Sequence, residues 1–183
     1  ELIQSKMKIL STLNKPIYVI AGNHDGYSPI DVSVNAVRQT LSHIVNVVDD
    51  KSGLVFKKYL LMPFTADEQE FAKNISKQEY LDKTLVCHQT FNGAEYENGF
   101  YAPHGFNTKS VPQKYIISGD IHKSQSFDKI FYTGSVNTTS SSDVYPLEKF
   151  FSGSTNKAIY LHDSEVNTFK VFAIDDLIKT YFN

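Results

Sequence analysis

Three short apolar runs, each followed by a polar segment with a histidine, constrain the fold of this chain more than any other feature. The runs occupy residues 17–21, 85–87 and 115–117, and the histidines that follow them are His24, His88 and His122. A short continuous apolar run is typical of a strand buried on both faces. In α/β folds, sites collect beyond the carboxyl ends of the strands. We therefore expect an α/β fold with a site at these strand ends.

The segments between the runs predict helices and further strands. Helical spacing of apolar residues predicts helices over residues 1–14 and 30–42, and the polar segment 66–82 favours a third helix. Further strands are expected at 44–48, 54–56, 59–62 and 130–132, with a last hairpin formed by 158–161 and 168–172. Asp49–Gly53 is interpreted as the hairpin loop between the first two of these strands, and residues 91–113 and 137–143 as long loops. We expect one domain over residues 1–183, with mixed sheets.

The composition excludes several classes of protein. With 183 residues, 41% of them hydrophobic and 21% charged, the chain is typical of one soluble globular domain. A net charge of −2 excludes a generally basic coat for nucleic acid, although a local basic groove remains open. No apolar run approaches the roughly 18–20 residues of a membrane span. The single cysteine, Cys87, excludes an internal disulfide; we expect a cytoplasmic location and a Cys87 side chain in the core.

Polar residues after the three runs are of the types that bind metal. Imidazole, carboxylate and amide oxygen are ligands for Mn, Fe, Zn and similar divalent ions. Asn23, His88, Asp120 and His122 could therefore converge on metal, which leaves His24 as an acid–base group. A lone histidine at a strand end is usually structural, but three at corresponding strand ends favour a site. The remaining histidines, His43, His104 and His162, are interpreted as ordinary structural or surface residues.

These segments resemble motifs of the calcineurin-like metallophosphoesterases. Gly22–Asp25 resembles the GNHD motif of that superfamily, and Cys87–Gln89 resembles its single-histidine motif. Gly119–His122 resembles its GHxH motif, with Asp120 in place of the first histidine. The resemblance covers nearly the whole chain and implies a β-sandwich of mixed sheets, flanked by helices, with a two-metal site.

One branch of the superfamily is more similar than the others. Gly119–Gln125, Ile130–Ser135 and the Thr/Ser-rich run that ends at Asp143 are similar to the SbcD-like exonuclease subunits of double-strand-break repair and phage recombination. This resemblance implies Mn-dependent hydrolysis of phosphodiester bonds in DNA. It also implies an SMC-like ATPase of the SbcC type as partner, with a homodimer as a further option.

The resemblance assigns a role to six residues. One metal would be bound by Asn23, His88 and Asp120, and the other by His122. His24 would act near the leaving group and Asp25 would orient it. Mn is the expected metal, with Mg, Fe or Zn as alternatives, because a carboxylate ligand at Asp120 shifts the preference toward harder ions. The competing interpretation of Asp120 is that it only caps the tight turn after Gly119.

One departure from the family pattern leaves alternatives open. In the family, two further motifs, DxH and GDxxD, supply the rest of the metal site to which His122 would contribute. Both motifs lie upstream of the segment that corresponds to the predicted first helix. We therefore expect an N-terminally incomplete domain in which His122 alone serves its metal. The resemblance implies enzymatic activity for the complete protein and leaves the activity of this chain alone open. The alternatives are a phosphatase or phosphodiesterase for small substrates on the same fold, and an inactive fragment or non-catalytic domain.

Overall fold

The computed structural model describes residues 2–28, 30–136 and 157–173, whose contacts form two compact units. The first unit runs to His88 and includes Val111–Lys114, whereas the second comprises Gln89–Ser110 and the chain from Tyr115 onward. Both units contain parallel and antiparallel strand pairs, and the α-helices of the described residues lie in the first unit. The structure thus confirms the predicted mixed α/β class. The loop predicted at 137–143 lies outside the described residues.

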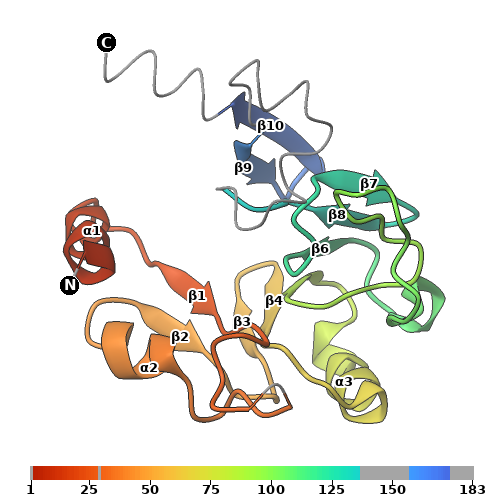
Figure 1. Ribbon diagram of the computed structural model, residues 1–183, viewed down its shortest axis with the longest axis horizontal. Helices are drawn as coiled ribbons and strands as arrows, with labels where there is room; N and C mark the ends of the chain where they lie inside the picture. Colours follow the sequence, from red (N-terminus) through yellow and green to blue (C-terminus); the bar gives the residue numbers. More distant parts are fainter. Residues whose placement is uncertain (1, 29, 137–156, 174–183) are drawn as a thin grey trace. The chain divides into compact units, whose positions relative to one another are not determined.

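The first unit begins with two helices and a pair of parallel strands (Figure 1). These elements are α1 (Leu2–Ser11), β1 (Tyr18–Ile20), α2 (Ala36–Leu41) and β2 (Asn46–Val48). In the parallel pair, Val19 lies opposite Val47. All three residues of β1 are half-buried, so the prediction of a strand buried on both faces is wrong here. The reason is that β1 and β2 form a sheet of only these two strands within the described residues.

Both helices are shorter than the sequence predicts. Helix α1 ends at Ser11, and Asn14 follows with a left-handed φ of 52°, which asparagine tolerates better than most residues. Helix α2 begins only at Ala36, because the side chain of Asn35 accepts a hydrogen bond from the Arg38 N–H and caps the helix. Val34 lies before the start of the helix and is exposed.

The prediction that Asp49–Gly53 closes a hairpin is wrong. Strand β2 pairs with β1, whereas β3 (Leu54–Phe56) forms an antiparallel pair with β4 (Tyr59–Met62). The hairpin turn lies instead at Lys57 and Lys58, with Lys57 at a φ of 54°. Gly53 closes only a local turn, in which its N–H donates to the Asp50 carbonyl at 2.9 Å. Strand β5 (Thr84–Cys87) runs parallel to β4 and carries the buried Cys87, as predicted.

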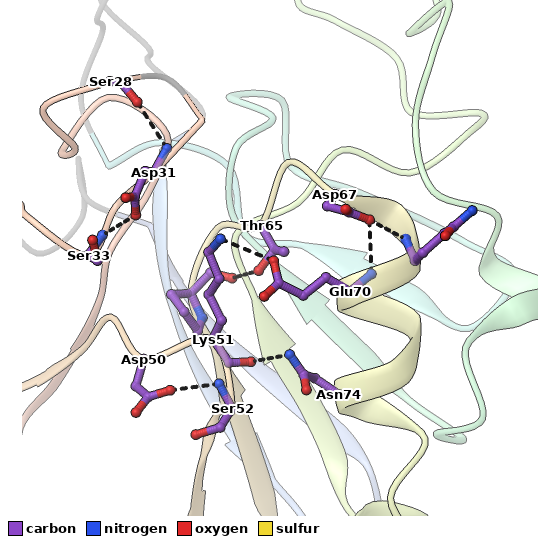
Figure 2. Close-up of polar contacts among 12 residues, drawn as sticks. Ser28, Asp31, Ser33, Asp50, Lys51, Ser52, Thr65, Asp67, Glu70 and Asn74 are labelled. Atoms are coloured by element: carbon purple, nitrogen blue, oxygen red, sulfur yellow. Dashed lines mark hydrogen bonds and ion pairs between the residues drawn. The ribbon is translucent and has the colours of Figure 1, made fainter.

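Helix α3 (Glu68–Ile75) is fixed at its start and along its side by polar contacts (Figure 2). The Asp67 carboxylate caps it by accepting from the N–H groups of Gln69 and Glu70. Lys51 forms an ion pair with Glu70 at 3.1 Å, and its carbonyl accepts from the Asn74 side chain at 2.8 Å. A separate 3₁₀ turn, η1 (Gln78–Tyr80), follows, so the single helix predicted over 66–82 is divided.

The second unit contains a three-stranded group and a separate hairpin (Figure 1). Strands β6 (Ile116–Ser118) and β8 (Ile130–Tyr132) are parallel, and β7 (Gln125–Phe127) pairs antiparallel with β8. A 3₁₀ turn, η2 (Thr108–Ser110), lies in the long loop before them. Strands β9 (Ala158–Asp163) and β10 (Thr168–Ala173) form the predicted last hairpin. The Phe131 ring of β8 stacks on Phe169 of that hairpin, with centroids 4.2 Å apart.

Candidate metal centre

The loop after β1 is a tight turn closed by Asp25. The Asp25 carboxylate accepts from the Gly22 N–H at 2.8 Å, and the Asp25 N–H donates to the Gly22 carbonyl at 3.1 Å. The Asp25 carbonyl accepts from the N–H of Ala36, the first residue of α2, at 3.0 Å. Asp25 therefore fixes the shape of the loop and joins it to the start of α2. The imidazole of His24, within this turn, is exposed.

The loop brings Asn23 next to His88, which directly follows β5. The His88 Nε2 atom lies 3.3 Å from the Asn23 Oδ1 atom. The same Oδ1 accepts from the His24 backbone N–H at 3.1 Å. Because only the oxygen of the carboxamide can accept, this second bond sets which end of the Asn23 amide faces His88. The pair therefore presents two atoms that can bind a metal ion, one oxygen and one nitrogen, close together.

The distance between these two donors is compatible with a shared cation. Atoms that each lie about 2.1 Å from one ion are about 3.0 Å apart at a right angle and about 3.4 Å apart at the tetrahedral angle. The observed 3.3 Å lies between these values. The same distance also fits a hydrogen bond from an imidazole N–H to the amide oxygen. Asn23 and His88 are thus suited to hold a divalent ion, and metal-binding measurements separate the two interpretations.

Gly22 allows the His88 ring to approach the loop. A Cβ atom at Gly22 would lie 2.8 Å from His88 Nε2 and 2.9 Å from His88 Cε1, closer than non-bonded atoms approach. Gly22 is buried, and its φ is not in the left-handed region. The requirement for glycine at this position therefore comes from the imidazole.

An ion pair between the half-exposed Arg38 and the buried Asp49 supports the loop through α2. Arg38 of α2 contacts the Asp49 carboxylate through both Nε and Nη2, and Asn35 donates to the same carboxylate at 2.8 Å. The Arg38 hydrogen bonds lower the pKa of Asp49, while Asp49 raises the pKa of Arg38. Because Asn35 also caps α2, this network holds the helix start to which Asp25 is bonded.

In the second unit, Asp120 follows β6 in a left-handed conformation. Its φ is 77°, a value that aspartate and asparagine adopt more readily than most residues. The Thr90 hydroxyl donates a short hydrogen bond to the Asp120 carboxylate. Thr90 lies two residues after His88, yet sequence reasoning did not identify it. The half-buried Asp120 carboxylate therefore has a partner that fixes its orientation, whether it binds metal or only shapes the turn.

His122 has an exposed side chain and an anchored backbone. Its carbonyl accepts from the Ser135 N–H at 3.1 Å and from Lys157 Nζ at 3.5 Å. Gly134 lies at this contact with a φ of 72°, and a Cβ atom there would be 2.7 Å from the His122 carbonyl oxygen. The loops after β6 and β8 thus meet backbone to backbone.

The four predicted ligands are divided between the units, with Asn23 and His88 in the first and Asp120 and His122 in the second. The structure brings Asn23 and His88 into direct contact, whereas Asp120 and His122 share one loop. Among the described residues, no group of three or more His, Cys, Asp and Glu side chains is arranged to hold a metal ion.

The other three histidines lie outside the short segments that directly follow β1, β5 and β6. His43 and His104 are exposed. His162 is half-buried, with Nε2 2.9 Å from Asn167 Oδ1 and its ring stacked on Phe169.

Comparison with known proteins gives no assignment. No protein-family model matches the chain, and no curated protein sequence matches it. Over residues 2–28, 30–136 and 157–173, no helix is both long enough and apolar enough to cross a membrane.

Proposed function

We propose that this chain belongs to a metal-dependent phosphoesterase with the calcineurin-like β-sandwich fold, and that it hydrolyses phosphodiester bonds in DNA as an SbcD-like nuclease subunit. The observation that carries the proposal is the Asn23–His88 pair, whose donor atoms are 3.3 Å apart on segments that follow two strands. Gly22 supports it, because the glycine leaves room for the imidazole.

The proposed ligand set extends beyond this pair. The sequence resemblance alone implies that Asp120 would join Asn23 and His88 at one cation and that His122 would contribute to a second. Mn²⁺ is the first choice, with Mg, Fe or Zn as alternatives. When bound, such a cation polarises the phosphate ester and lowers the pKa of a bound water molecule. Asn23 and His88 would bind the cation through an oxygen and a nitrogen atom that the loop and Gly22 hold in place.

The proton-transfer role falls to His24. Its imidazole is exposed and adjacent to Asn23, so it can donate a proton to the leaving oxygen of a substrate bound there. Asp25 acts on His24 through the backbone, because its carboxylate accepts from Gly22 and closes the turn that carries both residues. The proposed partners are DNA and an SMC-like ATPase of the SbcC type.

Two observations favour other functions. The net charge of −2 and the single arginine, Arg38, favour a small phosphoester substrate, since a DNA backbone is bound mainly through many cationic side chains. The lack of a group of three His, Cys, Asp or Glu side chains among the described residues favours a non-catalytic domain.

A single-turnover cleavage assay tests the proposal. The wild-type chain with Mn²⁺ is compared with His24→Ala, and with His43→Ala as a control that removes an exposed histidine elsewhere. Substrates are end-labelled DNA and a small chromogenic phosphodiester. The proposal requires that any Mn²⁺-dependent DNA cleavage by the wild-type chain is abolished in His24→Ala and preserved in His43→Ala, with equal metal content in all three proteins.

Each other outcome has a defined meaning. DNA cleavage that survives in His24→Ala contradicts the assigned mechanism. Cleavage of the small ester alone supports the small-substrate alternative. Bound Mn²⁺ without cleavage of either substrate supports a non-catalytic domain.

A further inference from the structure

A buried lysine in the second unit joins three segments. Lys157, just before β9, donates to the Ser135 hydroxyl at 2.8 Å and to the His122 carbonyl at 3.5 Å. It also forms an ion pair with Glu97 at 3.6 Å. The side chain is only 5% exposed. A buried ammonium is costly unless it is paired and hydrogen-bonded, and the loops around Lys157 meet both conditions.

The two loops that Lys157 joins are already in backbone contact. The Ser135 N–H donates to the His122 carbonyl at 3.1 Å, so that carbonyl accepts from both Ser135 and Lys157. Gly134 permits this approach, because a Cβ atom there would lie 2.7 Å from the same oxygen and 2.9 Å from Ser124 N. Lys157 therefore adds a charged donor to a contact that the backbone has made close.

This contact has a consequence for the His122 side chain. The imidazole is exposed. The backbone of residue 122, from which the ring projects, is held at its carbonyl by Ser135 and Lys157. Asp120, two residues earlier, has a strained φ of 77° that such anchoring helps to maintain.

We propose that Lys157 is a positioning residue for the loop Gly119–His122 and tunes its affinity for a divalent cation. The part of this inference that concerns the cation rests on the proposed function. The part that concerns the contact between the loops does not. Lys157 acts through the His122 carbonyl and the Ser135 hydroxyl, so it needs no contact with the ion. A residue of this kind is an outer partner of a metal site: it orients the metal ligands without binding the ion itself.

Three variants and one control test the inference. Lys157→Met removes the ammonium and keeps most of the side-chain stem, whereas Lys157→Arg keeps a positive charge. Ser135→Ala removes one partner and leaves the lysine. The control is Lys123→Met, which removes a lysine that is adjacent to His122 in the chain but pairs with Glu95 at 2.6 Å. The readouts are Mn²⁺ affinity, hydrogen exchange of the Ser135 amide, and melting temperature.

We expect Lys157→Met to bind Mn²⁺ about tenfold more weakly, the low end of the range for outer partners of a metal site. The Ser135 amide should exchange faster, Lys157→Arg should recover most of the affinity, and Lys123→Met should match the wild type. A folded Lys157→Met protein with wild-type affinity and wild-type Ser135 exchange would overturn the inference.

Two further results remain decisive. If Lys157→Met does not fold, Ser135→Ala decides: weaker Mn²⁺ binding at an unchanged melting temperature supports the inference, and unchanged binding overturns it. If the wild type itself binds no Mn²⁺, the proposed function fails separately. Ser135 exchange then decides whether Lys157 positions the loop, with faster exchange in Lys157→Met supporting it and equal exchange overturning it.

Discussion

The Nε2 atom of His88 lies 3.3 Å from the Oδ1 atom of Asn23, although the two residues are 65 positions apart in the chain. The loop after β1 and the end of β5 meet at this contact. A hydrogen bond or a shared cation fits the distance equally well. The contact depends on Gly22, on the turn closed by Asp25 and on the His24 N–H, each of which can be changed separately.

Gly22→Ala should destabilise the first unit by bringing a methyl group against the His88 ring. The added Cβ would lie 2.8 Å from Nε2, and overpacking of this kind costs about 1–3 kcal/mol. The free energy of unfolding from urea titration measures this. In a His88→Ala background the same change should cost much less, because the ring is gone. An equal cost in both backgrounds would show that the ring is not what requires glycine.

Asp49→Asn should lower stability at neutral pH and have less effect in acid. Arg38 lowers the pKa of Asp49 below its ordinary value of 3.8, so folding favours the carboxylate. The resulting stabilisation is complete above that ordinary value and is lost as the pH falls through the folded-state pKa. We expect a loss of about 1–2 kcal/mol at pH 7, limited because Arg38 is half exposed, and a smaller difference from wild type below about pH 4.

Urea unfolding at several pH values checks this dependence. Asp82→Asn is the control, since Asp82 also pairs with a lysine, the adjacent Lys83, but is highly exposed. It should leave stability unchanged. A difference between Asp49→Asn and wild type that persists undiminished at pH 3 would contradict the assigned role of the ion pair.

Gly134→Ala should cost more than Gly99→Ala, although both glycines have a left-handed φ. The φ values are 72° and 84°, so each substitution carries the strain of that region, about 1–2 kcal/mol. At Gly99 the nearest atom to an added Cβ is Glu95 Oε1 at 3.9 Å, whereas at Gly134 it is the His122 carbonyl oxygen at 2.7 Å. Denaturant unfolding should therefore separate the two variants, and equal losses would mean that the loops can part without cost.

Asp120→Asn should preserve the turn and weaken metal binding. Asparagine adopts a left-handed φ as readily as aspartate, so the backbone at 77° is retained, but the negative charge is lost. Thr90→Val should also weaken Mn²⁺ binding, by about tenfold, since it removes the hydroxyl that orients the carboxylate, whereas Thr90→Ser should keep it. Titration calorimetry with Mn²⁺ checks both variants. Unchanged affinity in Asp120→Asn would leave Asp120 with only the turn-capping role.

Local sequence patterns predicted most elements, but of their pairings they predicted only the last hairpin. The apolar runs identify β5, β6 and β8, and the last hairpin, because a short apolar run carries its own signal. Strand β7 was missed, since Gln125-Ser126-Phe127 shows no such run. The hairpin was misplaced because Lys57-Lys58 lacks the usual turn residues, while Asp49–Gly53 contains them.

The candidate site was predictable only in part, for a related reason. The loop Gly22–Asp25 and His88 carry a recognisable pattern, and the structure brings Asn23 and His88 together. The contacts that support them do not follow from local patterns. Arg38 meets Asp49 across 11 positions and Lys157 meets Ser135 across 22, and such distant contacts depend on the tertiary fold.

The most direct test of the central claim is Mn²⁺ binding in a double-mutant cycle, followed by the electron paramagnetic resonance signal of free Mn²⁺. The proteins are wild type, Asn23→Ala, His88→Ala and the double variant, with His43→Ala as the control. If Asn23 and His88 hold one cation together, each single variant should bind Mn²⁺ at least about tenfold more weakly, and the double variant should be hardly worse than the weaker single one. Wild-type affinity in both single variants would contradict the claim and leave the 3.3 Å contact as a hydrogen bond only.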